Sequence, residues 1–336
     1  MKKILSDLIL ILFFLPLNSN SQVLNDKVHY VLVVDKTKSM IGQGDGYGNN
    51  IWKDVLNAAE EFIDSLPNKG QVSVYTFADS PSGKTTFDLE RSNSKNDLKQ
   101  FISSITVDGN FTAIYDALNK VFMELVKPGS NEPILIYLFT DGKDNKSRID
   151  FDDILAYYEA NRTDYVHAYY IKLRGNIDSA LKDKIRGSKG ITAIEPTQIN
   201  TTSVFPITIM PGFMKLSYNL ALKNQQTQIF KIQGEKLKSG FKFDAKLTDT
   251  DPLFGNIALS KNSGYFFTGE NNECIFEIQV YGKLNTEKGK TYKGKIKLSN
   301  PDDGIHKISF FPDEFEVEFT NENPPKVIVK QNWKKN

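Results

Sequence analysis

The chain has 336 residues, 40% of them hydrophobic, and its 42 basic side chains nearly balance its 41 acidic ones. That length favours two domains over one, because single hydrophobic cores seldom grow beyond about 250–300 residues. The near-zero net charge argues against a general nucleic-acid-binding protein, which would show a strong basic excess. The single cysteine, Cys274, excludes a disulfide framework and a Cys-based zinc site, and three scattered histidines argue against a His-rich metal centre.

The N-terminus has the three parts of a secretory signal peptide. Lys2 and Lys3 form a basic start, an apolar run covers 8–17, and Ser19 and Ser21 fit a small-x-small cleavage site. The run is too short for a bilayer-spanning helix, which needs about 20 residues. We therefore expect residues 1–21 to be a signal peptide, with an uncleaved N-terminal anchor as the alternative. The mature protein is then exported to the periplasm, the cell surface or the medium, and its Lys-, Asn- and Ile-rich composition is typical of bacteria.

Between residues 22 and 200 the pattern alternates between strands and helices. Uninterrupted apolar runs predict buried parallel strands over 29–34, 72–77, 134–139, 166–171 and 191–194. Apolar residues at helical spacing predict helices over 51–66, 98–105, 112–126, 151–158 and 179–185. This alternation is typical of a doubly wound, Rossmann-like α/β sheet.

From about residue 211 the apolar residues recur with a period of two and no helical window appears. The alternation predicts short strands over 217–222, 228–232, 241–247, 275–281, 292–298 and 315–319. We expect a linker over 201–210, an Ig-like antiparallel β-sandwich over 211–322 and a tail over 323–336. The charge supports this boundary, since residues 22–206 carry 21 basic and 25 acidic side chains whereas 207–336 carry 19 and 15.

Polar side chains with oxygen donors follow the first predicted strand. Asp35, Thr37 and Ser39 occupy alternate positions of the loop, where one carboxylate and two hydroxyls can turn toward a single point. Ligands of doubly wound sheets bind beyond the carboxyl ends of the strands. Hard oxygen donors of this kind suit magnesium, manganese or calcium. Taken alone, the pattern fits an ordinary turn or helix cap equally well.

Two further loops strengthen the metal interpretation. Thr112 stands at the entry to a predicted helix, and Asp141 follows the predicted strand 134–139. Each has a simple alternative, a helix N-cap for Thr112 and a turn for Asp141-Gly142. Because all three loops fall at one edge of the predicted sheet, they bring two carboxylates and three hydroxyls to the same place.

This arrangement resembles the von Willebrand factor type A family and its metal-ion-dependent adhesion site. In that family D-x-S-x-S follows the first strand, a loop threonine comes next, and a T-D-G aspartate comes third. The resemblance covers about residues 26–198. Thr37 stands where serine is usual and keeps the hydroxyl, whereas Phe111 stands before Thr112 where glycine is frequent, which narrows access to the metal.

The resemblance implies a fold, a metal site and a function. Its metal ligands would be Asp35, Thr37, Ser39, Thr112 and Asp141, holding Mg²⁺ (or Mn²⁺ or Ca²⁺) with one coordination position left for a partner. A partner protein would supply an Asp or Glu carboxylate to that position. The implied function is divalent-metal-dependent protein binding or cell adhesion without catalysis.

Two other functions remain open. The protein is alternatively a structural or assembly subunit of a cell-envelope complex in which the metal only stabilises loops. A metal-dependent hydrolase is the third interpretation, but no side chain stands out as its nucleophile or base. The segment 78–85 is a degenerate phosphate-loop match without a helical pattern after it, so no nucleotide is expected. We also expect no nucleic-acid partner, and membrane contact only through the export signal.

Overall fold

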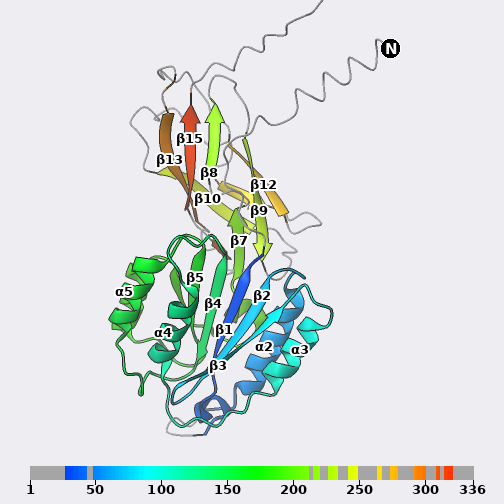
Figure 1. Cartoon of the computed structure of the whole chain (residues 1–336), viewed down its shortest axis with the longest axis vertical. Coiled ribbons are helices and arrows are strands. Elements are labelled where there is room, and N and C mark those ends of the chain that lie inside the picture. The colour runs from blue at the N-terminus through cyan, green and yellow to red at the C-terminus, as the bar shows by residue number, and fades with distance from the viewer. Residues whose placement is uncertain are drawn as a thin grey trace, which may run out of the picture.

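The computed structural model describes residues 27–43, 48–211, 215–219, 226–233, 241–248, 263–266, 273–278, 289, 291–299, 308–310 and 314–320 (Figure 1). The expected signal peptide, the expected tail and residues 44–47 of the glycine-rich loop lie outside these ranges. Among the helices in the described ranges, none is long and apolar enough to cross a bilayer.

A six-stranded sheet with helices on both faces confirms the predicted α/β fold (Figure 1). Its strands run in the spatial order β3-β2-β1-β4-β5-β6, and every neighbouring pair is parallel except β2 with β3. The strands are β1 (His29–Asp35), β2 (Gln71–Phe77), β3 (Pro81–Asp88), β4 (Ile134–Thr140), β5 (Val166–Lys172) and β6 (Ile191–Ile194).

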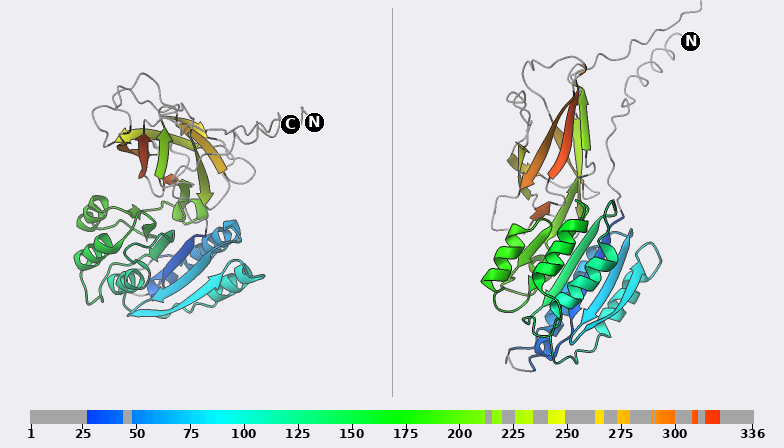
Figure 2. Two further views of the ribbon diagram at one scale, coloured as in Figure 1. Left: turned by 45° about the horizontal axis from the view of Figure 1, so that its top comes forward. Right: turned by 60° about the vertical axis from the view of Figure 1, so that its left-hand side comes forward.

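The central strand β1 shows why the apolar runs are uninterrupted. Tyr30 and Leu32 belong to a core shared with α2 (Trp52–Ser65) and α3 (Ser94–Ser103). Val31 and Val33 belong to a second core on the opposite face of the sheet. That face is covered by α4 (Ile114–Leu125), α5 (Phe151–Asn161) and α6 (Ser179–Gly187). Figure 2 shows the same layering from two further directions. Because both faces are buried, polar alternation is absent from these strands.

The sequence pattern does not predict strand β3. This strand overlaps the segment 78–85, which resembles a phosphate-binding loop. Gly83 and Lys84 lie within this strand, which pairs antiparallel with β2. Phosphate-binding loops lead into a helix whose amides face the phosphate, whereas this stretch leads into a strand. The sequence pattern of β3 is weak because the strand lies at the edge of the sheet and most of its residues are exposed or half-buried.

The segment expected as a linker over 201–210 contains α7 (Thr201–Val204) and the beginning of β7 (Ile207–Pro211). Val204 and Phe205 are buried in the core on the α2 side of the sheet. The Phe205 ring stacks on Phe62 with 3.9 Å between the ring centroids and an interplanar angle of 7°. Residues 201–205 therefore pack as part of the α/β unit, because two large apolar side chains tie the segment to it.

Phe205→Leu is expected to lower the free energy of unfolding by about 1–1.5 kcal/mol, since the ring contacts are lost while most of the volume is kept. Denaturant unfolding of the full chain measures the effect. Phe111→Leu is a matched control, because 47% of Phe111 is exposed, and it should change the unfolding free energy by less than about 0.5 kcal/mol. Equal effects for the two variants would contradict the packing role of Phe205.

After α7, every described element is a strand, as the period-two pattern predicts. One sheet has the order β11-β10-β13-β15-β8 and the other has the order β12-β9-β7-β14. Two pairs, β15 with β8 and β14 with β7, are parallel, unlike the expected antiparallel arrangement. Long stretches of chain separate these partners, so no hairpin forces them to be antiparallel. The remaining strands are β8 (Lys215–Asn219), β9 (Gln226–Gln233), β10 (Phe241–Thr248), β11 (Ser263–Phe266), β12 (Glu273–Ile278), β13 (Thr291–Ser299), β14 (Ile308–Phe310) and β15 (Glu314–Thr320).

Candidate metal centre

Asp35 is the last residue of β1 and its side chain is fully buried. One carboxylate oxygen accepts a hydrogen bond from the backbone N–H of Thr37 at 2.9 Å, which folds the chain into a tight turn after the strand. The other accepts from the Thr140 hydroxyl, at the end of the neighbouring strand β4, at 2.7 Å. Two donors thus fix the orientation of a carboxylate at the sheet edge where ligands of such folds bind.

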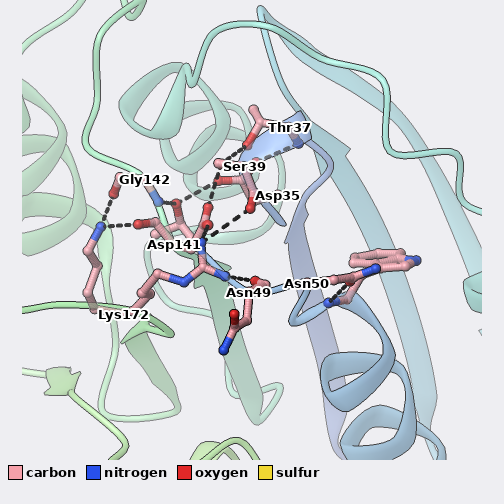
Figure 3. A network of polar contacts seen from close by, with 11 residues as sticks. Asp35, Thr37, Ser39, Asn49, Asn50, Asp141, Gly142 and Lys172 are labelled. Atoms are coloured by element: carbon pink, nitrogen blue, oxygen red, sulfur yellow. Dashed lines mark hydrogen bonds and ion pairs between the residues drawn. The ribbon is translucent and has the colours of Figure 1, made fainter. Parts of the chain in front are cut away.

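Ser39 links the first loop to the loop after β4. Its hydroxyl donates to a carboxylate oxygen of Asp141 at 2.7 Å and lies 2.8 Å from the Thr37 hydroxyl (Figure 3). Ser39 belongs to the short 3₁₀ helix η1 (Lys38–Ile41), which Gly42 ends with a φ of 74°. A Cβ at Gly42 would lie 2.3 Å from the carbonyl oxygen of Gly48, so both the backbone angle and the close approach require glycine there.

The loop that carries Thr112 lies directly beside the first loop. Thr37 and Gly109 form a parallel bridge, and the Lys38 N–H donates to the Gly109 carbonyl at 2.8 Å. Asp79 accepts from the backbone N–H groups of Asn110 and Phe111 at 3.1 and 2.7 Å. These bonds hold the backbone that leads into Thr112 without using its hydroxyl.

The loop after β4 holds Thr112 from the other side. Thr112 and Asn145 exchange two bonds, from the Thr112 N–H to the Asn145 side chain at 2.8 Å and from the Asn145 N–H to the Thr112 carbonyl at 3.0 Å. A Cβ at Gly142 would lie 3.0 Å from the Thr112 hydroxyl oxygen, so glycine lets the two loops approach closely. Thr112 does not cap the helix, because the N-cap residue of α4 is Ala113 and makes no side-chain cap bond.

The structure therefore brings together the five residues predicted as ligands, with Asp35, Thr37, Ser39 and Asp141 in one hydrogen-bonded network and Thr112 packed against Gly142. Burial raises the pKa of Asp35 to about 6, the bonds from Thr140 and Thr37 oppose this shift, and the charge of Asp141 adds to it. Two neighbouring buried carboxylates are unfavourable unless a cation compensates them.

Sequence reasoning missed the cations that provide part of this compensation. Lys172 is buried and donates to the backbone carbonyl of Asp141 at 2.7 Å and to that of Gly142 (Figure 3). Arg174 forms an ion pair with the Asp141 carboxylate at 3.3 Å. The available signal was their place at the end of β5, the same sheet edge that singled out Asp35 and Asp141.

The donor set fits a hard divalent cation. Oxygens in adjacent positions around an octahedral Mg²⁺ lie about 3 Å apart, given Mg–O distances of about 2.1 Å. The oxygens of Thr37 and Asp141 lie 2.8 and 2.7 Å from that of Ser39, as hydrogen-bonded partners, which places the three close enough to share one cation. Nowhere in the described ranges do three or more His, Cys, Asp or Glu side chains cluster as a metal site. A cation here would therefore depend on hydroxyl oxygens together with the two carboxylates.

A cavity of about 300 Å³ adjoins the network, with Gly142 and Lys172 in its wall. Aromatic side chains, charged side chains and the start of α6 complete its lining, including Tyr115, Phe151, Tyr170, Lys143, Asp144 and Asp178. A partner that reached the network would have room for a neighbouring side chain in this cavity.

Residues 30–143 match the family model described as von Willebrand factor type A domain. No curated protein matches the chain.

The solved structures that match this chain share little of its sequence. Proximal thread matrix protein 1 from the mussel byssus is 18% identical, with 55% of this chain and 46% of that chain covered and a TM-score of 0.38. A von Willebrand factor type A protein from Catenulispora acidiphila is 12% identical, with 88% and 67% covered and a TM-score of 0.40. The ArnB paralog VWA2 from Sulfolobus acidocaldarius is 16% identical, with 90% and 68% covered and a TM-score of 0.38.

A further structure of the mussel protein is described as having a zinc-occupied MIDAS motif. The chain spans about half the length of the mussel structures it matches, at 46% and 54%. The family match over residues 30–143 includes all five predicted ligands, the strands β2 and β4, and all of β1 except His29. Residues 30–143 are therefore similar to a von Willebrand factor type A domain.

Proposed function

We propose that this is an exported binding protein that holds a divalent cation at the ends of β1 and β4 and uses it to bind a carboxylate of a partner protein. The observation that carries the proposal is the 2.7 Å contact between Ser39 and Asp141, which lie 102 positions apart in the chain. This contact brings the hydroxyl-bearing loop after β1 next to the buried carboxylate of Asp141. Both lie at the sheet edge where α/β folds bind their ligands.

The predicted ligands contribute to cation binding in two different ways. Thr37, Ser39 and Thr112 offer hydroxyl oxygens, while Asp35 and Asp141 supply the negative charge that attracts the cation. Thr140 orients the Asp35 carboxylate through its 2.7 Å hydrogen bond. When bound, the cation, Mg²⁺ in the first place and Mn²⁺ or Ca²⁺ as alternatives, provides an electrophilic position for an Asp or Glu carboxylate.

The surface beside the network suits an acidic partner. Lys38 contacts the Asn110 side chain at 2.9 Å, and the Lys146 ammonium lies 5.0 Å from the centre of the exposed Phe111 ring. Positive side chains attract a carboxylate-bearing segment, and an exposed ring offers apolar contact to its neighbours.

The rest of the chain would present this site. Residues 1–21 direct export, 22–200 form the metal-binding domain, and 211–322 form an Ig-like sandwich that acts as a spacer or a second contact surface. This division rests on the sequence pattern and on fold analogy.

A pull-down from the source cell tests the proposal. The full mature chain is used as bait with Mg²⁺ or Mn²⁺, with a chelator, and as the Asp141→Ala variant. A partner should be captured only with metal and only by the wild type. Asp108→Ala is the matched control, because it removes an exposed carboxylate that pairs with Lys36 on the neighbouring loop, and it should keep binding.

The structural-subunit alternative gives a different result in the same experiment. In that case chelation lowers the melting temperature while the captured partner stays bound. Capture that is equal with metal, with chelator and with Asp141→Ala would contradict metal-bridged recognition.

A further inference from the structure

Arg174, just beyond β5, covers the carboxylate of Asp141. Its guanidinium lies 3.3 Å from the Asp141 carboxylate oxygen that Ser39 does not use, and it also donates to the Ser39 carbonyl at 3.4 Å. The Asp141 side chain is 2% exposed, whereas that of Arg174 is 28% exposed. The arginine thus lies between Asp141 and solvent.

Arg174 also fastens the loop on the other side of the site. Its second guanidinium nitrogen donates to the backbone carbonyl of Asn49. A Cβ at Gly48 would lie 2.2 Å from one guanidinium nitrogen and 2.5 Å from the guanidinium carbon. The arginine therefore reaches Asp141 only because residue 48 is glycine.

Each of the four carboxylate oxygens at the site accepts a hydrogen bond from a protein donor, and among the donors named below only Arg174 is charged. Asp35 accepts from the Thr37 N–H and the Thr140 hydroxyl, and Asp141 accepts from the Ser39 hydroxyl and from Arg174. Burying an uncompensated carboxylate is costly, so the guanidinium does for Asp141 what a bound cation would do.

We propose that Arg174 is a tethered counter-ion that competes with the divalent cation for Asp141 and so sets the metal affinity of the site. The inference rests on the proposed function, since it assigns a regulator to the same metal site. Metal binding has to displace the guanidinium from Asp141, which also removes its contact with Asn49. The loop containing Gly48 and Asn49 is then released when the cation binds.

Calorimetric titration of the full mature chain with MgCl₂ and MnCl₂ tests the competition. Arg174→Gln should bind metal about tenfold or more tightly than the wild type, because Asp141 loses its competing charge. Arg174→Lys should fall between them, since it keeps the charge but loses the forked geometry. Lys143→Gln is the matched control for net charge, because Lys143 lies two residues from Asp141 and is exposed. It should change the affinity less than threefold.

Gly48→Ala provides a second test that removes no charge. The added methyl group overlaps the guanidinium, whose flexible end can move away, and the backbone angle of Gly48 suits any residue. This variant should raise metal affinity in the same direction as Arg174→Gln.

The outcomes separate the competition from the metal site itself. Asp35→Asn tests the site without touching Arg174, and equal metal binding by this variant and the wild type would overturn the proposed function. If Asp35→Asn loses binding but neither Arg174→Gln nor Gly48→Ala binds more tightly than the wild type, the competition is overturned and the metal site stands. Absence of binding by wild type and Arg174→Gln alike overturns both.

Discussion

Asp35→Asn is expected to lower the affinity for Mg²⁺ by at least about 100-fold, while the protein remains folded. The substitution removes one of the two charges that attract the cation and keeps the shape of the side chain. An asparagine oxygen can still accept the Thr37 N–H bond that forms the turn after β1. Calorimetric titration with MgCl₂ measures the affinity.

The same substitution should leave the unfolding free energy unchanged or raise it by about 1 kcal/mol in the presence of a chelator. A neutral amide costs less to bury than a carboxylate. Removing the Asp35 carboxylate also relieves its repulsion from Asp141. Asp108→Asn, which removes an exposed carboxylate, should change neither quantity. A large loss of stability together with normal metal affinity would show that Asp35 is a structural residue instead.

The second large effect is a loss of stability in mild acid that originates at His29. This residue is 3% exposed, and its ring lies 2.8 Å from the Ser73 hydroxyl and 3.6 Å from the Glu132 carboxylate. Burial, with a contribution from Lys84, lowers the pKa of His29 to about 4 from its ordinary value of 6.5. The neutral ring is therefore the form that the folded state accommodates.

Between pH 6.5 and 4 the unfolded chain binds a proton at His29 that the folded chain does not. Stability is therefore present above pH 6.5 and falls as the pH decreases, by about 2 kcal/mol between pH 7 and pH 5 for this one group. Burial lowers the pKa of His167 to about 3 as well, so it contributes in the same direction.

Urea unfolding at pH 7 and pH 5 measures this dependence. His29→Gln should remove the His29 share of the decrease, since glutamine still reaches Ser73 but does not titrate. The double variant with His167→Gln should remove the decrease in stability between pH 7 and pH 5. An unchanged decrease in the double variant would place the acid sensitivity in other groups.

The sequence determined most elements of the α/β sheet and the choice of the predicted ligands. Uninterrupted apolar runs such as Ile134–Phe139 identify buried strands because both faces of a parallel sheet are covered. Asp35 is recognisable because it directly follows the apolar run 29–34. Asp141 is recognisable because it stands two positions after the run 134–139. These are local signals, and they rest on the periodicity of neighbouring side chains.

Only the tertiary structure decided which distant residues meet. Nothing local in the sequence shows that Phe205 stacks on Phe62, or that β8 pairs in parallel with β15. Strand β3 escaped prediction because an edge strand is mostly exposed and needs no apolar run. Such contacts join residues that are far apart in the chain, and the periodicity of neighbouring side chains does not specify them.

The metal-centre region shows the same division. Composition alone left oxygen ligands as the credible metal chemistry, and the spacing of Asp35, Thr37, Ser39, Thr112 and Asp141 assigned them to three loops. Packing brought those loops together and added Arg174, which contacts Asp141 and, 125 positions away in the chain, Asn49. The reason is physical: a buried carboxylate requires a counter-charge, and only the folded chain determines which cation is within reach.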